Sequence, residues 1–128
     1  MNPVEYLEAV KERLLTDPIV LGFQIRRERI TLADGHLRVR ASLSDGSFLE
    51  FTEYVERAPK GQVQVVTYSY HWANAAGGLI QRWDNTPHSP DLPGFPHHIH
   101  DGASGEVVPG QPLDIFAVLE TISQALAA

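Results

Sequence analysis

Apolar positions follow a helical period at the start of the chain. From Val4 to Leu14 they recur every three or four residues, with charged side chains between them. Asn2 is a good capping residue, Pro3 is favoured at the first helical position, and Glu5 stands where a capping box requires it. We therefore expect a helix that begins after Asn2 and ends at Asp17-Pro18, because the residue before a proline disfavours helical backbone.

The pattern between residues 19 and 84 changes to short apolar–polar alternations that are separated by turn residues, as is typical of β-strands. Asp34-Gly35 and Asp45-Gly46 are typical hairpin turns, and the other connections are short as well. Parallel neighbours would need a crossover of a dozen or more residues, so we expect an antiparallel meander. Five strands are predicted, over residues 19–32, 36–44, 48–57, 63–73 and 79–84.

The register of the strand at residues 48–57 stays open in the sequence. Phe48 and Tyr54 share one face, whereas Leu49, Phe51 and Val55 share the other. Both sets are apolar enough for a core, and a slip of one residue would exchange them.

The C-terminal part of the chain returns to a helical pattern. A last helix is predicted from Pro112, with an apolar stripe at Ile115, Leu119, Ile122 and Leu126 that should pack on the sheet. The fold predicted is a single α+β domain over residues 1–128. It has a five-stranded antiparallel meander flanked by an N-terminal and a C-terminal helix, with a rigid loop rich in proline and histidine.

That loop, residues 82–101, holds four of the six histidines and four of the nine prolines. Proline fixes φ and lowers the entropy of the unfolded chain, so four of them suit a loop that is held in one shape. We expect Trp83 and Phe95 to pack against protein rather than solvent. The rest of the chain is interpreted as a scaffold for this loop.

Composition excludes some functions. Without cysteine the chain can form neither a disulfide nor a thiolate metal site. Its formal net charge of −6 argues against a general nucleic-acid coat. The N-terminus shows no secretory pattern, and no apolar run reaches membrane-spanning length, so a cytoplasmic protein without membrane contact is expected.

The positive charge is nevertheless concentrated. Seven of the ten Lys and Arg residues fall between Arg26 and Lys60. A two-residue turn at Asp34-Gly35 would place Arg38 opposite Thr31 and Arg40 opposite Arg29. Local basic surface could then form on one side of the sheet, from Arg27, Arg29, Arg38 and Arg40.

The histidines allow a metal site. In an extended segment, His98 and His100 lie on one side, and His97 lies on the other. Two imidazoles in this arrangement suit Zn²⁺, Fe²⁺ or Mn²⁺, and His71, His88 or Asp101 could complete the set.

Acid–base chemistry without a cofactor is the other functional interpretation. Histidine titrates near neutral pH, so two of them can move protons in phosphodiester transfer while an arginine stabilises the charged transition state. A purely structural role, in which the histidines bond backbone carbonyls of the loop, is the third interpretation. The candidate catalytic residues are His71, Arg82, Asp84, His88, His98 and His100, and the candidate phosphate-binding residues are Arg38, Arg40 and Arg82.

Three motifs between residues 53 and 102 resemble the TumE family, small proteins regarded as toxin halves of bacterial and archaeal toxin–antitoxin pairs. They are Tyr-Ser-Tyr-His-Trp at 68–72, Arg-Trp-Asp-Asn-Thr-Pro-His at 82–88 and Phe-Pro-His-His-Ile-His at 95–100. This chain departs from the family at Ser89, where relatives often carry a second histidine. A helix followed by a meander is also similar in outline to the RelE-like ribonuclease toxins.

The resemblance implies a toxin with an antitoxin protein as its partner, but it supplies no mechanism. Three hypotheses follow: a ribonuclease that uses the histidine cluster, a metal-dependent hydrolase with the ligands His98, His100 and Asp101, and a non-enzymatic protein-binding module. RNA is a further expected partner, and a homodimer is compatible with the sequence.

Overall fold

The computed structural model describes residues 1–87 and 90–128. Within these residues it forms two helices and seven strands. Their order is α1 (Pro3–Thr16), β1 (Val20–Ile30), β2 (Asp34–Leu43), β3 (Phe48–Arg57), β4 (Val63–Ala73), β5 (Leu79–Asp84), β6 (His98–Asp101), β7 (Val107–Pro109) and α2 (Ile115–Ala127). Neither helix of this described part is long and apolar enough to cross a membrane.

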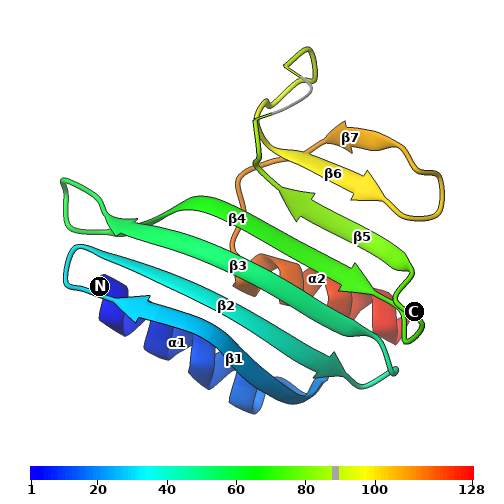
Figure 1. The fold of residues 1–128 in the computed structure, drawn as a ribbon, viewed down its shortest axis with the longest axis horizontal. Coiled ribbons are helices and arrows are strands. Elements are labelled where there is room, and N and C mark those ends of the chain that lie inside the picture. Colours follow the sequence, from blue (N-terminus) through cyan, green and yellow to red (C-terminus); the bar gives the residue numbers. More distant parts are fainter. Residues whose placement is uncertain (88–89) are drawn as a thin grey trace.

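All seven strands lie in one sheet, in chain order from β1 to β7, and every pair is antiparallel (Figure 1). The meander prediction is therefore confirmed, but the number of strands was wrong. The two extra strands, β6 and β7, have four and three residues, which is too short for a visible alternation. The stretch expected to be loop thus re-enters the sheet at His98.

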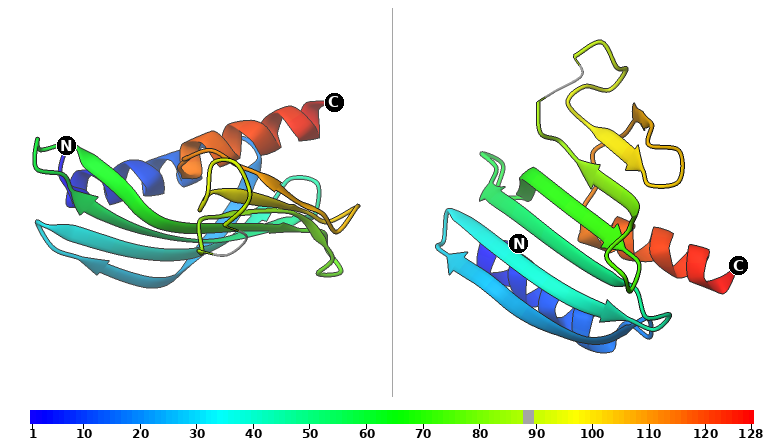
Figure 2. Two further views of the ribbon diagram at one scale, coloured as in Figure 1. Left: turned by 90° about the horizontal axis from the view of Figure 1, so that it is seen from above. Right: turned by 45° about the vertical axis from the view of Figure 1, so that its right-hand side comes forward.

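Both helices pack on the same face of the sheet (Figure 2). The capping box of α1 forms as predicted, since Asn2 Oδ1 accepts the N–H of Glu5 at 2.9 Å and Glu5 Oε1 accepts the N–H of Asn2 at 3.0 Å. Helix α2 begins at Ile115, three residues later than predicted. Asp114 caps it by accepting the N–H of Ala117 at 3.0 Å.

The core lies between the helices and the sheet, and it settles the register of β3. Leu49, Phe51 and Val55 are buried beneath the helices, whereas Phe48 and Tyr54 lie on the opposite face. We call this opposite face, which neither helix covers, the open face.

The first hairpin corrects a prediction. Ile30 pairs with Gly35, so the connection is made by residues 31–33, and Asp34-Gly35 belongs to β2. The Thr31 hydroxyl organises this turn by accepting the N–H groups of Ala33 and Asp34. As a result Arg38 lies opposite Arg27, and Arg40 lies opposite Gln24.

The expectation about the two aromatic residues of the loop is half confirmed. Trp83 is buried on the helix-covered face of β5, whereas Phe95 is 44% exposed. The start of the loop is tied to β4 by Asn85, whose side chain accepts from the N–H of Tyr68 and donates to the carbonyl of Val66.

Candidate functional site

Two rows of polar side chains cross the open face from β2 to β6. Neighbouring strands lie about 4.8 Å apart, so each residue of a row is within reach of the next. The pairing of strands defines the first row as Arg40, Glu50, His71, Arg82 and His100, and the second as Arg38, Thr52, Ser69, Asp84 and His98.

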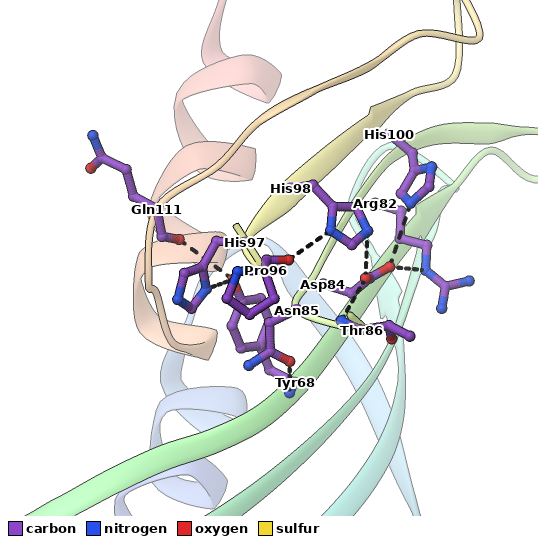
Figure 3. A network of polar contacts seen from close by, with 10 residues as sticks. All are labelled: Tyr68, Arg82, Asp84, Asn85, Thr86, Pro96, His97, His98, His100 and Gln111. Atoms are coloured by element: carbon purple, nitrogen blue, oxygen red, sulfur yellow. Dashed lines mark hydrogen bonds and ion pairs between the residues drawn. The ribbon is translucent and has the colours of Figure 1, made fainter. Parts of the chain in front are cut away.

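Asp84 lies at the centre of the histidine end of these rows (Figure 3). Its side chain is only 2% exposed. Oδ1 accepts the N–H of Thr86 at 3.1 Å and lies 2.7 Å from Nε2 of His98. Oδ2 accepts from Nε of Arg82 at 2.9 Å and lies 3.6 Å from Nε2 of His100. One buried carboxylate thus connects three basic side chains.

The extended geometry of β6 places His98 and His100 on the same side of the strand, as the spacing predicts. Their rings meet edge to face with centroids 4.9 Å apart. Nδ1 of His98 lies 2.8 Å from the carbonyl oxygen of Pro96. Because a carbonyl only accepts hydrogen bonds, Nδ1 carries the proton, and Nε2 is directed toward Asp84.

His97 belongs to the other side of the sheet. Its ring stacks on that of Tyr68, with 5.8 Å between centroids, and its Nδ1 lies 2.7 Å from the Tyr68 hydroxyl. This imidazole therefore packs against Tyr68 and does not contribute to the open face.

A shallow hollow of about 450 Å³ lies beside the histidine cluster. Burial and the nearby Arg82 charge lower the pKa of His71, which favours the neutral imidazole. Arg82 is 40% exposed, so its guanidinium is accessible from solvent. The lining residues are Arg38, Glu50, Thr52, Ser69, His71 and Arg82.

The other end of the open face is basic. Arg27 and Arg38 lie directly opposite each other on β1 and β2. Burial, Arg27, Arg29 and Arg38 together lower the pKa of His36 between them. Glu50 partly neutralises this end by binding Arg38 at 2.8 Å and Arg40 at 3.4 Å. These arginines hold the pKa of Glu50 below its usual value, with the Arg38 hydrogen bond as the largest cause.

The candidate residues named from the sequence are thus largely brought together. His71, Arg82, Asp84, His98 and His100 adjoin one another, and Arg38 and Arg40 lie on the same face. His88 is outside the described residues. Asp101, named as a metal ligand from the sequence, closes the turn after β6 by accepting from the N–H and hydroxyl of Ser104, and its role as a ligand stays a prediction.

Sequence reasoning missed the polar residues of the hollow. Glu50, Thr52 and Ser69 line it together with Arg38, His71 and Arg82. The sequence did hold a signal for them, because residues two apart in a strand lie on the same face: Ser69 is two residues from His71, and Glu50 is two from Thr52. That signal could be read only once the register of β3 was known.

Comparison with known proteins identifies a family. The model of a family described as Toxin TumE matches residues 10–127, which is most of the chain. No curated protein and no solved structure matches the chain.

Proposed function

We propose that this chain, which belongs to the TumE toxin family, is an RNA-cleaving toxin whose reaction takes place on the open face of the sheet. Membership of a toxin family implies an antitoxin partner. The observation that carries the proposal is the row formed by His71, Arg82 and His100, in which an arginine lies between two imidazoles on neighbouring strands.

Cleavage of an RNA phosphodiester by its own 2′-hydroxyl makes three demands. A base removes the proton of the attacking hydroxyl, a second group stabilises the departing 5′-oxygen, and positive charge stabilises the phosphoryl oxygens. The P–O5′ bond breaks as the 2′-oxygen bonds to phosphorus, and the product is a cyclic phosphate.

Arg82 is suited to bind the phosphoryl group of the RNA. Its Nε is held by Asp84, and the terminal nitrogens of the guanidinium point away from that carboxylate (Figure 3). A guanidinium held in this way can still donate two parallel hydrogen bonds to a phosphoryl group.

His71 is suited to act as the general base. It pairs with Arg82 across β4 and β5 and lines the hollow, and its lowered pKa keeps the imidazole ready to accept a proton at neutral pH. Asp84, His98 and His100 lie on the opposite side of Arg82, where the departing oxygen would be.

The basic end of the open face supports RNA binding despite the net negative charge. Arg38 and Arg40 are on β2, three strands from Arg82, which is about 14 Å at the usual strand spacing. Phosphates adjacent to the cleaved one could therefore contact these arginines.

The test uses tag-free protein and a labelled single-stranded RNA, with a DNA of the same sequence as the substrate control. We expect cleavage of the RNA to cyclic phosphate ends and no cleavage of the DNA. His71→Gln and Arg82→Ala should each lower the rate by about 10²–10⁴. His97→Gln is the matched control, because His97 lies on the other side of the sheet against Tyr68. Absence of RNA cleavage, or an equal loss in the control, would contradict the proposal.

A further inference from the structure

We infer that Asp84, His98 and His100 form a binding site for one divalent transition-metal ion of the Zn²⁺ class. What the ion would do rests on the proposed function, whereas the binding itself is independent of it. Each of the three residues offers one ligand atom, and these atoms all lie within 4.8 Å of one another.

The spacing of the donors suits a small ion. A tetrahedral ion with ligands at about 2.1 Å holds neighbouring donors about 3.4 Å apart. The 3.6 Å between Asp84 Oδ2 and His100 Nε2 is close to that value. His98 Nε2 lies 2.7 Å from the other carboxylate oxygen, Oδ1, and this pair would have to open by about 0.7 Å if Oδ1 were the oxygen that binds the ion.

His98 is oriented as a metal ligand would be. A ligating imidazole usually donates its other N–H to a carbonyl or carboxylate, which fixes its tautomer. Here Nδ1–H of His98 donates to Pro96 O at 2.8 Å, and this orientation of the ring directs Nε2 toward the Asp84 carboxylate. A metal ion between these groups would be bound by Nε2 of His98 and by the Asp84 carboxylate together.

The carboxylate is held by groups that do not compete for the ion. Thr86 N–H donates to Oδ1 of Asp84, and Arg82 Nε donates to Oδ2. A carboxylate oxygen has more than one lone pair, so both oxygens keep acceptor capacity. Hydrogen bonds of this kind from outside the ligand shell orient a metal site.

The donor set indicates the kind of ion. Two imidazoles and one carboxylate suit Zn²⁺, Fe²⁺ or Mn²⁺, whereas Ca²⁺ and Mg²⁺ prefer oxygen ligands alone. His100 is 28% exposed and provides an entry path. Three protein ligands leave a position for a water or substrate oxygen, and a Lewis acid there would stabilise the departing oxygen of RNA.

The test is direct binding without RNA. Tag-free chain is treated with a chelator, dialysed, and titrated with Zn²⁺ by calorimetry and with Co²⁺ by visible absorption. We expect one ion per chain, a Co²⁺ spectrum of low coordination number, and displacement of Co²⁺ by Zn²⁺. His100→Gln and Asp84→Asn should each weaken binding by at least about 10²-fold, more than the loss of an outer hydrogen bond does.

Two neighbouring variants serve as controls. Asp101→Asn removes the carboxylate next to His100, and His97→Gln removes the imidazole next to His98, yet neither group reaches the site. Binding should be unchanged in both. Absence of a Co²⁺ spectrum in the unmodified chain, or binding that survives in His100→Gln and Asp84→Asn, would overturn the inference.

This experiment also separates the two proposals. Metal binding by a chain that cleaves no RNA would keep the site and refute the proposed function. RNA cleavage by a chain that binds neither Zn²⁺ nor Co²⁺ would refute the site and keep the proposed function.

Discussion

Ile115 donates its backbone N–H to Oε2 of Glu53 at 2.8 Å, which ties the first residue of α2 to the middle of the sheet. The same carboxylate accepts the hydroxyl of Tyr6 from α1 at 2.8 Å and that of Tyr70 from β4. Glu53 is 1% exposed, so a single buried side chain connects both helices with two strands.

Removal of this connection should be costly. Glu53→Ala leaves three donors without their acceptor in the core, and we expect a loss of about 3 kcal/mol or more in the free energy of unfolding. Urea denaturation measures it, with Glu56→Ala on the exposed end of the same strand as the control. Equal losses in the two variants would show that the Glu53 hydrogen bonds contribute little.

The buried tyrosines predict a loss of stability at alkaline pH. Burial and the Asp84 charge raise the pKa of Tyr68 to about 12, and burial with the Glu53 charge raises the pKa values of Tyr6 and Tyr70 as well. Unfolded tyrosine ionises near pH 10, so above that pH the unfolded chain binds fewer protons than the folded chain. The free energy of unfolding should therefore fall as pH rises through 10. Phenolate absorbance from these residues before unfolding would contradict the prediction.

Gly102 should not tolerate a side chain. A Cβ at this position would lie 1.8 Å from the carbonyl oxygen of Leu79, directly where β6 leaves β5. Gly102→Ala must push these strands apart, which should cost about 1–3 kcal/mol or more and displace His100 from Arg82. Gly22→Ala is the control, because a Cβ there meets nothing within 4 Å. Thermal unfolding of the two variants is the measurement, and similar midpoints would contradict the clash.

Substitution of the two neighbouring histidines, His97 and His98, should affect RNA cleavage differently. His97→Ala removes the contact with Tyr68 and should cost about 1 kcal/mol of stability, while RNA cleavage stays unchanged. His98→Ala removes a ring beside Asp84 and should abolish cleavage. Both variants are assayed on RNA after their melting temperatures have been compared. Small and equal losses of activity that follow the melting temperatures would favour a structural role for both.

Arg27→Glu should separate stability from RNA binding. Arg27 faces Arg38 directly, and like charges in that position repel, so an opposite charge should raise stability by about 0.2–1 kcal/mol. RNA affinity should fall, and the slope of log affinity against log salt should decrease by about one. Binding measured over a series of salt concentrations tests this. An unchanged affinity would show that RNA does not reach β1.

Local patterns account for much of what the sequence predicts correctly. The predictions agree with the structure for the ranges of β3, β4 and β5 and for the start of α1. These features depend on capping residues, turn residues and apolar–polar alternation, all of which involve residues close together in the sequence. The alternation of side chains along a strand also correctly predicts that His97 lies on the opposite side of the sheet from His98 and His100.

What failed depends on contacts between distant residues. The burial of Glu53 involves hydrogen bonds from Tyr6, Tyr70 and Ile115, which are all distant from it in sequence. The sequence left the register of β3 open for the same reason, since the helices that cover one face of the strand are distant in the chain. Likewise, the approach of Asp84 to His98 follows from pairing of β5 with β6, and β6 was hidden by its short length. Asp101 was named as a candidate ligand because it is adjacent to His100 in sequence, whereas the pairing of β5 with β6 brings Asp84 next to both His98 and His100 in space.

The sheet order that follows the chain order has a consequence for folding. Each strand pairs with the strand made just before it, and most connections are short, the 13 residues between β5 and β6 being the longest. The sheet therefore has fewer distant pairings than a Greek key of similar size. During synthesis the sheet can therefore grow hairpin by hairpin from the N-terminus. The rows on the open face are completed only when β6 adds to β5, after the five preceding strands have been made. A nascent chain therefore carries an incomplete histidine site until β6 has left the ribosome and paired with β5.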